Sequence, residues 1–211
     1  MFLPRRLLLV CLLALAAALL GRDALTEAVD AVRDAAEGLP GAGGASGAEG
    51  RVTHVRDGDT FEARVGGAEQ VVRLIGIDTP ESVRPGTPVE CGALEAKDLL
   101  LRLLFTRPRD TDGDGLVDRD GGRGRRVVLE ADRTQDDEDR YGRTLRYARV
   151  RGASRTVQER ILAAGWAAVF VFQHRRFERF DAFVAAARKA KRARRGIYAR
   201  CGGDFHHPAR E

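Results

Sequence analysis

Residues 51–77 read RVTHVRDGDTFEARVGGAEQVVRLIGI, and the architecture of the domain follows from them. Apolar and polar residues alternate in 51–56 and again in 60–65, which predicts two half-buried β-strands. Gly66-Gly67 is a hairpin turn signal, and residues 71–77 then form a third apolar run. The stretch therefore predicts three consecutive short strands joined by tight turns.

The remainder of the domain adds strands and helices to these three. Further strands are expected at 127–131 and 144–150, and helices at 91–105, 154–165 and 176–195. Five short strands with three helices between and after them are typical of an α+β fold built on a five-stranded OB-type barrel.

The N-terminal segment differs in composition from this domain. Two arginines precede an uninterrupted apolar run over residues 7–21, which is shorter than the ~20 residues of a membrane-spanning helix. Residues 1–22 therefore predict a secretory signal, with an uncleaved membrane anchor as the open alternative. A spacer and Gly-rich linker is expected at 23–50, the domain at 51–201 and a tail at 202–211. We expect a secreted or extracytoplasmic protein.

Composition excludes a wholly disordered chain and a protein with many membrane spans, because 44% of the 211 residues are hydrophobic and 32% are charged. The net charge of +5 is unevenly distributed. Residues 140–200 hold 17 Lys and Arg against 3 Asp and Glu, whereas residues 51–139 hold 14 against 20. An acidic first half and a basic second half suit a cation-dependent enzyme that acts on polyanions, although a surface of solvated salt bridges has the same composition.

Three sequence blocks carry a resemblance to a known family. They are Asp57-Gly58-Asp59-Thr60, the string RLIGIDTPE at 73–81, and Asp139-Arg140-Tyr141-Gly142-Arg143. In this order they resemble the staphylococcal nuclease (thermonuclease) family over about residues 51–201. The resemblance implies a monomeric Ca²⁺-dependent endonuclease that hydrolyses single-stranded or melted DNA and RNA and leaves 3′-phosphate ends.

A metal site is expected where two strands end. Asp59 and Asp78 each follow a strand, and barrel strand ends can bring such carboxylates together. Carboxylates and a backbone carbonyl suit a hard divalent cation, and the resemblance implies that Asp59, Asp78 and the carbonyl of Thr79 hold Ca²⁺. Asp57 is expected beside them, orienting a metal-bound water. Taken singly, Asp59 and Asp78 also fit turn carboxylates.

Catalytic roles follow from the same blocks. Glu81 is the candidate general base, with a surface glutamate after a proline turn as the alternative. Arg73 and Arg143 are expected to donate to the non-bridging phosphate oxygens as charge develops on them. The resemblance implies that Arg140 and Tyr141 contact the substrate phosphate.

Two features depart from the family. Phe170 and Phe172 stand where the family has tyrosines, and they either stack on bases or pack in the core, of which we favour the core. The acidic run at 136–139 would repel nucleic acid if it faced the cleft; alternatively it forms a solvated turn or helps to bind a cation.

The largest departure is an insertion at 106–126. Asp110, Asp112, Asp114 and Asp118 occupy positions one, three, five and nine of a loop with Gly115 at position six, as in EF-hand-like loops. The pattern predicts a possible second, weak Ca²⁺ site that orders the insertion, with an acidic solvated loop as the alternative.

Cys91 and Cys201 remain as an even pair if Cys11 leaves with the signal, and in an exported protein they predict a disulfide.

Two other function classes stay open: a non-catalytic OB-type module that binds nucleic acid or another polyanion, and a calcium-binding surface protein. A degenerate binding module would lose Arg73, Glu81 or Arg143, and this chain keeps all three.

Overall fold

The structure is a computed structural model, and it describes residues 47–82, 86 and 88–204. The predicted signal or anchor, most of the spacer and the end of the tail lie outside the described residues and stay predictions. Within the described part of the chain, no helix is long and apolar enough to cross a membrane.

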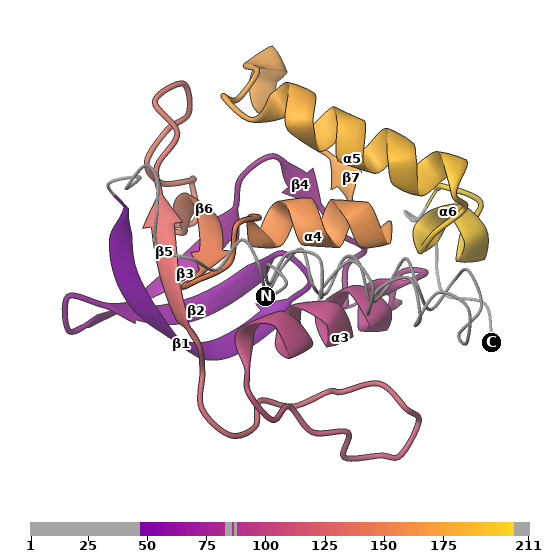
Figure 1. The fold of residues 1–211 in the computed structure, drawn as a ribbon, viewed down its shortest axis with the longest axis horizontal. Coiled ribbons are helices and arrows are strands. Elements are labelled where there is room, and N and C mark those ends of the chain that lie inside the picture. The colour runs from indigo at the N-terminus through magenta and orange to yellow at the C-terminus, as the bar shows by residue number, and fades with distance from the viewer. Residues whose placement is uncertain (1–46, 83–85, 87, 205–211) are drawn as a thin grey trace, which may run out of the picture. The chain divides into compact units, whose positions relative to one another are not determined.

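Five strands close into a barrel, which confirms the predicted fold class (Figure 1). They are β1 (Ala48–Asp57), β2 (Thr60–Val65), β3 (Ala68–Leu74), β5 (Arg126–Glu130) and β6 (Thr144–Val150). Around the barrel their order is β1-β2-β3-β6-β5, and every neighbouring pair is antiparallel except β3 with β6. The first strand begins at Ala48, so the domain starts three residues before the expected Arg51.

The third predicted strand is interrupted. β3 ends at Leu74, and Ile77–Asp78 forms a separate strand β4 that pairs with β7 (Ala168–Val169). The break falls at Gly76, whose φ of 77° lies in the left-handed region that glycine tolerates. A Cβ there would lie 2.6 Å from the ring of Phe177, so the close packing also requires glycine. This bend aims Asp78 and Thr79 away from the line of β3.

The helices follow the predicted apolar periodicity, with later starting points. They are α3 (Ala93–Leu104), α4 (Val157–Ala164), α5 (Phe180–Arg192) and the short α6 (Ile197–Arg200), with a 3₁₀ turn η1 at Phe172–His174. Thr156 caps α4 in a reciprocal box with Glu159, which satisfies the free N–H groups of the first turn. α5 starts at Phe180 rather than at the expected Arg176.

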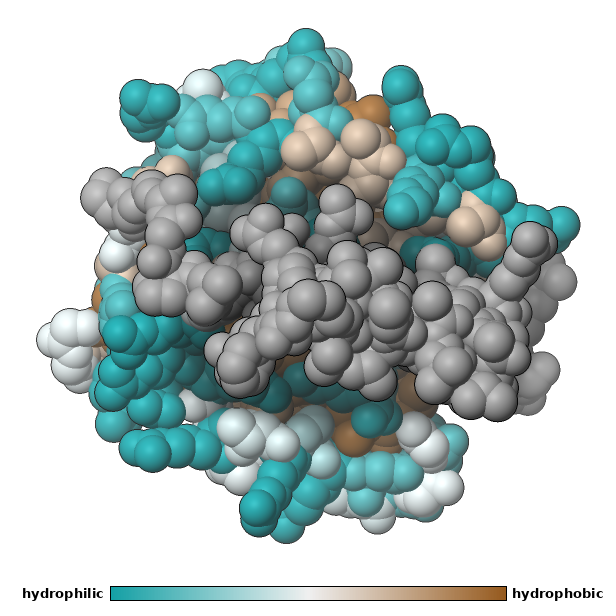
Figure 2. All heavy atoms as spheres, viewed as in Figure 1, coloured by the Kyte–Doolittle hydropathy of each residue, from teal (hydrophilic) through white to brown (hydrophobic). Residues whose placement is uncertain are grey.

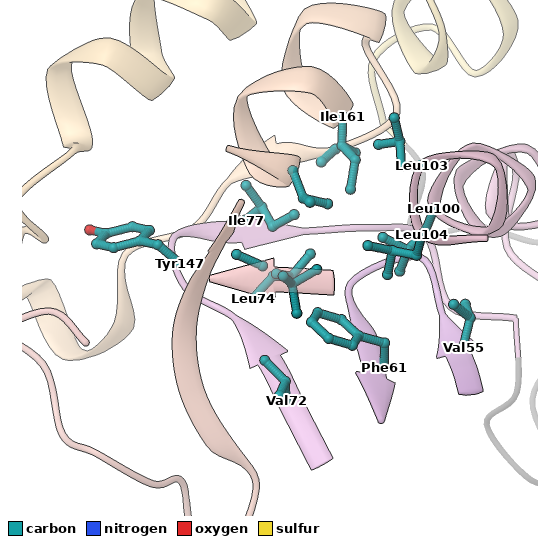
Figure 3. Close-up of a cluster of buried hydrophobic side chains, with 14 of the residues drawn as sticks. Val55, Phe61, Val72, Leu74, Ile77, Leu100, Leu103, Leu104, Tyr147 and Ile161 are labelled. Atoms are coloured by element: carbon teal, nitrogen blue, oxygen red, sulfur yellow. The ribbon is translucent and has the colours of Figure 1, made fainter. Parts of the chain in front are cut away.

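The core fills the barrel and the space beneath the helices. Phe61 and Leu74 of the barrel pack with Leu100 and Leu104 of α3 and with Ile161 of α4, and all five are buried (Figure 3). Each such fully buried side chain contributes about 1.5–3 kcal/mol. The helices are therefore attached to the barrel through its apolar interior.

A disulfide and a β-bridge add two further connections within the domain. A disulfide joins Cys91, just before α3, to Cys201, just after α6, with their Cα atoms 5.9 Å apart. The insertion follows α3, and a β-bridge between Phe105 and Gly124 joins its two ends. A Cβ on Gly124 would lie 1.9 Å from the backbone oxygen of Val52, so glycine allows the insertion to close against β1.

Candidate active site

The turn between β1 and β2 presents two buried carboxylates. Asp57 and Asp59 are each 7% exposed. A Cβ on Gly58 would lie 2.8 Å from both the Cβ of Ala96 and the Oγ1 of Thr79. Glycine therefore lets this turn lie directly against α3 and the segment that follows β4.

Arg73 joins the two predicted metal carboxylates. Its Nη1 lies 2.7 Å from Oδ2 of Asp59, and its Nη2 lies 3.2 Å from Oδ1 of Asp78. Nη1 also donates to the backbone oxygen of Ile77 at 3.0 Å. The guanidinium of Arg73 is thus paired with two carboxylates, one from the β1–β2 turn and one from β4.

The predicted ligand set has the chemistry of a Ca²⁺ site. The backbone N–H of Thr79 donates to Oδ2 of Asp59 at 3.2 Å, which brings Thr79 beside the two aspartates. Its hydroxyl is buried and has no hydrogen-bond partner, although buried polar atoms are nearly always paired. Two carboxylates and a threonine supply only oxygen donors, the kind that Ca²⁺ prefers. The residues present therefore fit the cation that the resemblance implies.

Asp57 and Glu81 form a carboxyl pair. Burial and a hydrogen bond with Glu81 together raise the pKa of Asp57 to about 7, against the opposing effect of the hydrogen bond from Ser82. Ser82 Oγ donates to Asp57 at 2.7 Å, while the backbone N–H of Glu81 donates to Oε2 of Glu90 at 2.8 Å. The predicted base is therefore held by its backbone beside a group that binds a proton near neutral pH.

The loop between β5 and β6 carries the remaining predicted residues. Nε of Arg143 lies 2.6 Å from Oδ2 of Asp139. The guanidinium carbons of Arg140 and Arg143 lie 4.7 and 5.3 Å from the ring centroid of Tyr141, which is 67% exposed. Tyr141 is thus held between two cations with most of its surface open to solvent.

One cavity of ≈ 690 Å³ brings the predicted basic residues together. It is lined by Arg73 from β3 and by Arg140, Tyr141 and Arg143 from the β5–β6 loop. Among the described residues, Glu81 and the predicted metal ligands are not part of this lining; Asp59 and Asp78 lie behind Arg73, in contact with its guanidinium.

Phe170 and Phe172 line the same cavity, so the favoured core interpretation was wrong. They are 44% and 49% exposed. The chain leaves β7 at Val169 and turns through Gln173 and His174, whose φ values of 48° and 59° are unusual for residues other than glycine. This turn keeps the two rings at the surface.

Three of the four acids in the run 136–139 pair with arginines, namely Asp136, Asp137 and Asp139. Asp136 accepts from Nη1 of Arg175 at 3.1 Å, and Oδ1 of Asp137 lies 2.6 Å from Nη1 of Arg146. Asp136 and Arg175 also line the cavity, together with Gln135, and sequence reasoning missed all three as site residues. No motif marks Arg175, since its partner lies 39 positions away.

The insertion brings three of its four predicted ligands together. Carboxylate oxygens of Asp110, Asp112 and Asp114 lie within 4.8 Å of one another, all on exposed residues. Asp118 is not in this group; it accepts from the backbone N–H of Thr111 at 3.1 Å and closes the base of the loop. The second Ca²⁺ site stays a prediction.

Comparison with known proteins agrees with this geometry. A family model described as staphylococcal nuclease homologue matches residues 71–200. The chain is 40% identical over 96 residues to a thermonuclease of Staphylococcus intermedius, a match covering 46% of this chain and 45% of that protein. It is 38% identical over 97 residues to a thermonuclease of Staphylococcus hyicus, covering 46% of each. Endonuclease YncB of Bacillus subtilis is 29% identical over 146 residues, covering 69% of this chain and 59% of YncB. The chain thus spans about half the length of the thermonucleases that it matches.

Proposed function

Because this chain belongs to the staphylococcal nuclease family, we propose that it is a Ca²⁺-dependent endonuclease that hydrolyses DNA and RNA to 3′-phosphate ends. One observation carries the proposal: Arg73 contacts both Asp59 and Asp78 and also lines the cavity that holds Arg143. Carboxylates for a cation and guanidinium groups for a phosphate therefore meet at one place.

Asp59, Asp78 and the carbonyl of Thr79 would hold the Ca²⁺. When bound, the cation supplies positive charge against the phosphoryl oxygens and lowers the pKa of water. The backbone N–H of Thr79 supports this assignment, because it donates to Oδ2 of Asp59 at 3.2 Å and so keeps Thr79 beside that carboxylate.

The arginines and the carboxyl pair perform the remaining steps in this proposal. Arg73 and Arg143 donate to the non-bridging oxygens, and these contacts strengthen as negative charge grows on them. Glu81 takes a proton from the attacking water, beside Asp57, which exchanges a proton near neutral pH. Breaking the bond between phosphorus and the 5′-oxygen leaves the phosphate on the 3′ side, and the 5′-oxygen takes up a proton.

The exposed rings in the cavity favour a single-stranded or melted substrate. Tyr141, Phe170 and Phe172 all line the cavity with exposed faces. Unpaired bases stack on such rings regardless of sequence, whereas bases inside a duplex are already stacked. This supports action on both DNA and RNA without base preference.

Secretion is part of the same proposal. The disulfide between Cys91 and Cys201 supports it, since disulfides persist in oxidising compartments outside the cytosol. The basic and apolar N-terminal segment supports it independently.

The test is hydrolysis of heat-denatured DNA by the full chain with millimolar Ca²⁺ and then with EGTA. We expect hydrolysis only with Ca²⁺, and 3′-phosphate ends on the products. Arg73→Ala and Glu81→Ala should each lower kcat by about 10²-fold or more. The control is Arg56→Ala, which removes an exposed guanidinium whose ion-pair partner among the described residues is Glu62.

Equal hydrolysis in EGTA would remove the cation from the mechanism. Nucleic-acid binding without hydrolysis, with or without Ca²⁺, would instead favour the non-catalytic binding module.

A further inference from the structure

Four arginines on neighbouring strands lie side by side on the outer face of the barrel. The strand register places Arg64 of β2 opposite Arg51 of β1, and Arg51 opposite Arg126 of β5. Arg151, directly after β6, donates its backbone N–H to the oxygen of Arg126 at 2.8 Å. Residues directly opposite one another project from the same face of a sheet, so these side chains form one row.

Only the outer two arginines of the row have acidic partners. Nη2 of Arg64 lies 2.7 Å from Glu69, and Nε of Arg151 lies 3.7 Å from Glu49. Across the described parts of the chain, Arg51 and Arg126 form no ion pair. The centre of the row is therefore uncompensated positive charge.

The insertion adds a third arginine to this centre. Two hydrogen bonds attach the C-terminal end of the insertion to β1. The backbone N–H of Val52 donates to the oxygen of Arg125 at 3.1 Å, and Nη1 of Arg51 donates to the oxygen of Gly124 at 2.8 Å. Partial burial lowers the pKa of Arg51, and the charges of Arg123 and Arg126 lower it further. We call Arg51, Arg123 and Arg126 the inner arginine cluster.

Packing does not explain this arrangement. Like charges directly opposite each other destabilise a sheet. Arg123 and Arg126 are exposed, so an uncharged polar residue would fit at either position. Where β1 and β2 lie in this view, the visible described surface is mostly hydrophilic (Figure 2). The cluster becomes favourable when an anion neutralises it.

We propose that the inner arginine cluster binds the phosphate backbone of nucleic acid outside the catalytic cavity. Arginine presents planar paired donors that match phosphate oxygens. The inference rests on the proposed function, which supplies the polyanion, and it adds a second contact surface for the same polymer.

The position of the cluster determines how long a nucleic-acid strand must be to contact both the cluster and the cavity. β5 begins at Arg126 and ends at Glu130, where the chain continues into the loop that carries Arg143 (Figure 1). Five residues of strand span about 17 Å, so the cluster and the cavity lie towards opposite ends of β5. A dinucleoside monophosphate has a single phosphodiester, so when it occupies the cavity it has no second phosphate that could reach the cluster.

Equilibrium binding tests the cluster without any hydrolysis. A fluorescent single-stranded DNA of about 30 nucleotides, which is long enough to reach both surfaces, is titrated in EGTA with the native chain and with the variant Arg51→Gln/Arg123→Gln/Arg126→Gln. We expect the slope of log K against log salt to become shallower by about 2, since each lost phosphate contact removes about 0.7. Affinity at low salt should fall roughly tenfold or more.

A matched variant controls for overall charge. Arg188→Gln/Arg192→Gln/Arg194→Gln removes the same charge from exposed positions in and after α5 that form no ion pair in the described structure. It should keep most of the native slope. An equal change in both variants would show that net charge, rather than this cluster, governs binding, and would overturn the inference.

Two further readouts separate the cluster from the active site and from the fold. With Ca²⁺, the cluster variant should keep native kcat and KM on a dinucleoside monophosphate, while its KM for the long strand rises about tenfold; an unchanged KM for the long strand would overturn the inference. Without nucleic acid, the variant Arg123→Gln/Arg126→Gln, which keeps the hydrogen bond from Arg51 to Gly124, should raise the Tm by about 1–3 °C as like-charge repulsion is relieved. A fall in Tm would assign the arginines a structural role instead. If the chain hydrolyses nothing but cluster-dependent binding persists, the proposed function fails and this inference stands.

Discussion

Arg143 and Asp139 form an ion pair in which Nε lies 2.6 Å from Oδ2, and the other carboxylate oxygen accepts the backbone N–H groups of Tyr141 at 2.9 Å and Arg143 at 3.0 Å. Burial works against ionisation of Asp139, but the hydrogen bonds from Arg143 and Tyr141 prevail and lower its pKa. One carboxylate therefore shapes the turn and aims the guanidinium into the cavity.

Replacing each member of this pair should have different consequences. Arg143→Ala should lower kcat by about 10²-fold, the effect of losing one oriented donor. Asp139→Asn keeps the size of the side chain but loses the ion pair, so we expect a smaller fall of about tenfold through loss of orientation. Steady-state hydrolysis of denatured DNA measures both.

Asp137→Asn is the matched control, because Asp137 pairs with Arg146 and neither residue lines the cavity. Native kcat in Asp139→Asn would show that Arg143 does not depend on this carboxylate for its position.

The two predicted calcium sites should separate in a calorimetric titration. Asp112→Ala/Asp114→Ala should remove one binding event and the calcium-dependent part of the stability, about 0.4–1.4 kcal/mol when free calcium is one to ten times Kd. Hydrolysis by the folded variant should change little, since the loop is not part of the cavity lining. Asp59→Ala/Asp78→Ala should do the reverse.

Loss of hydrolysis in the loop variant, at a temperature where it is folded, would place the insertion in the active site. An unchanged number of binding events would favour an acidic solvated loop.

Asp132 should make the stability of the domain depend on pH. This buried carboxylate accepts from the backbone N–H of Thr134 at 2.7 Å, from the N–H of Glu178 at 2.7 Å, and from the hydroxyl of Tyr147. Burial alone would raise the pKa of Asp132, but these hydrogen bonds prevail and lower it. Because the pKa of Asp132 is lower in the folded protein, its ionised form stabilises the fold at pH values above about 3.9, which is the pKa in the unfolded chain. That contribution to stability is lost as the pH falls through the lower pKa of the folded state.

Asp132→Asn should therefore lower the free energy of unfolding by about 2 kcal/mol or more at neutral pH, through hydrogen bonds to a charged acceptor. The difference from the native chain should shrink below about pH 4. Chemical unfolding at both pH values measures it, with the exposed Asp181→Asn as control. A difference that is constant with pH would contradict the assignment.

Removal of the disulfide should destabilise the domain without altering the site. Cys91 and Cys201 are 110 positions apart, and closing a loop of that length stabilises by about 4–5 kcal/mol in the chain-entropy model. Cys91→Ser/Cys201→Ser should lose a comparable free energy of unfolding, whereas kcat below its Tm stays native. Peptide mapping without reductant should find the two cysteines linked; two alkylated thiols in exported protein would contradict the pairing.

Local patterns in the sequence predicted the five barrel strands and the three main helices, and short sequence blocks indicated the family's site residues. Alternation over a few residues is enough to identify a strand, because side chains project to opposite faces in turn. The family's site residues sit in short blocks such as RLIGIDTPE, so they could be named without knowing where the blocks meet. The exposure of Phe170 and Phe172 escaped this reasoning, because apolar residues after a strand are usually buried.

Tertiary structure alone decided which of these residues touch. The contact of Arg73 with Asp59 and Asp78 arises because the β1–β2 turn, β3 and β4 come together at one point. The pairing of Asp136 with Arg175 and the opposition of Arg51 to Arg126 depend likewise on how the strands and loops are aligned. Strand register and barrel closure depend on packing across the whole core, so they cannot be predicted from a short stretch of sequence.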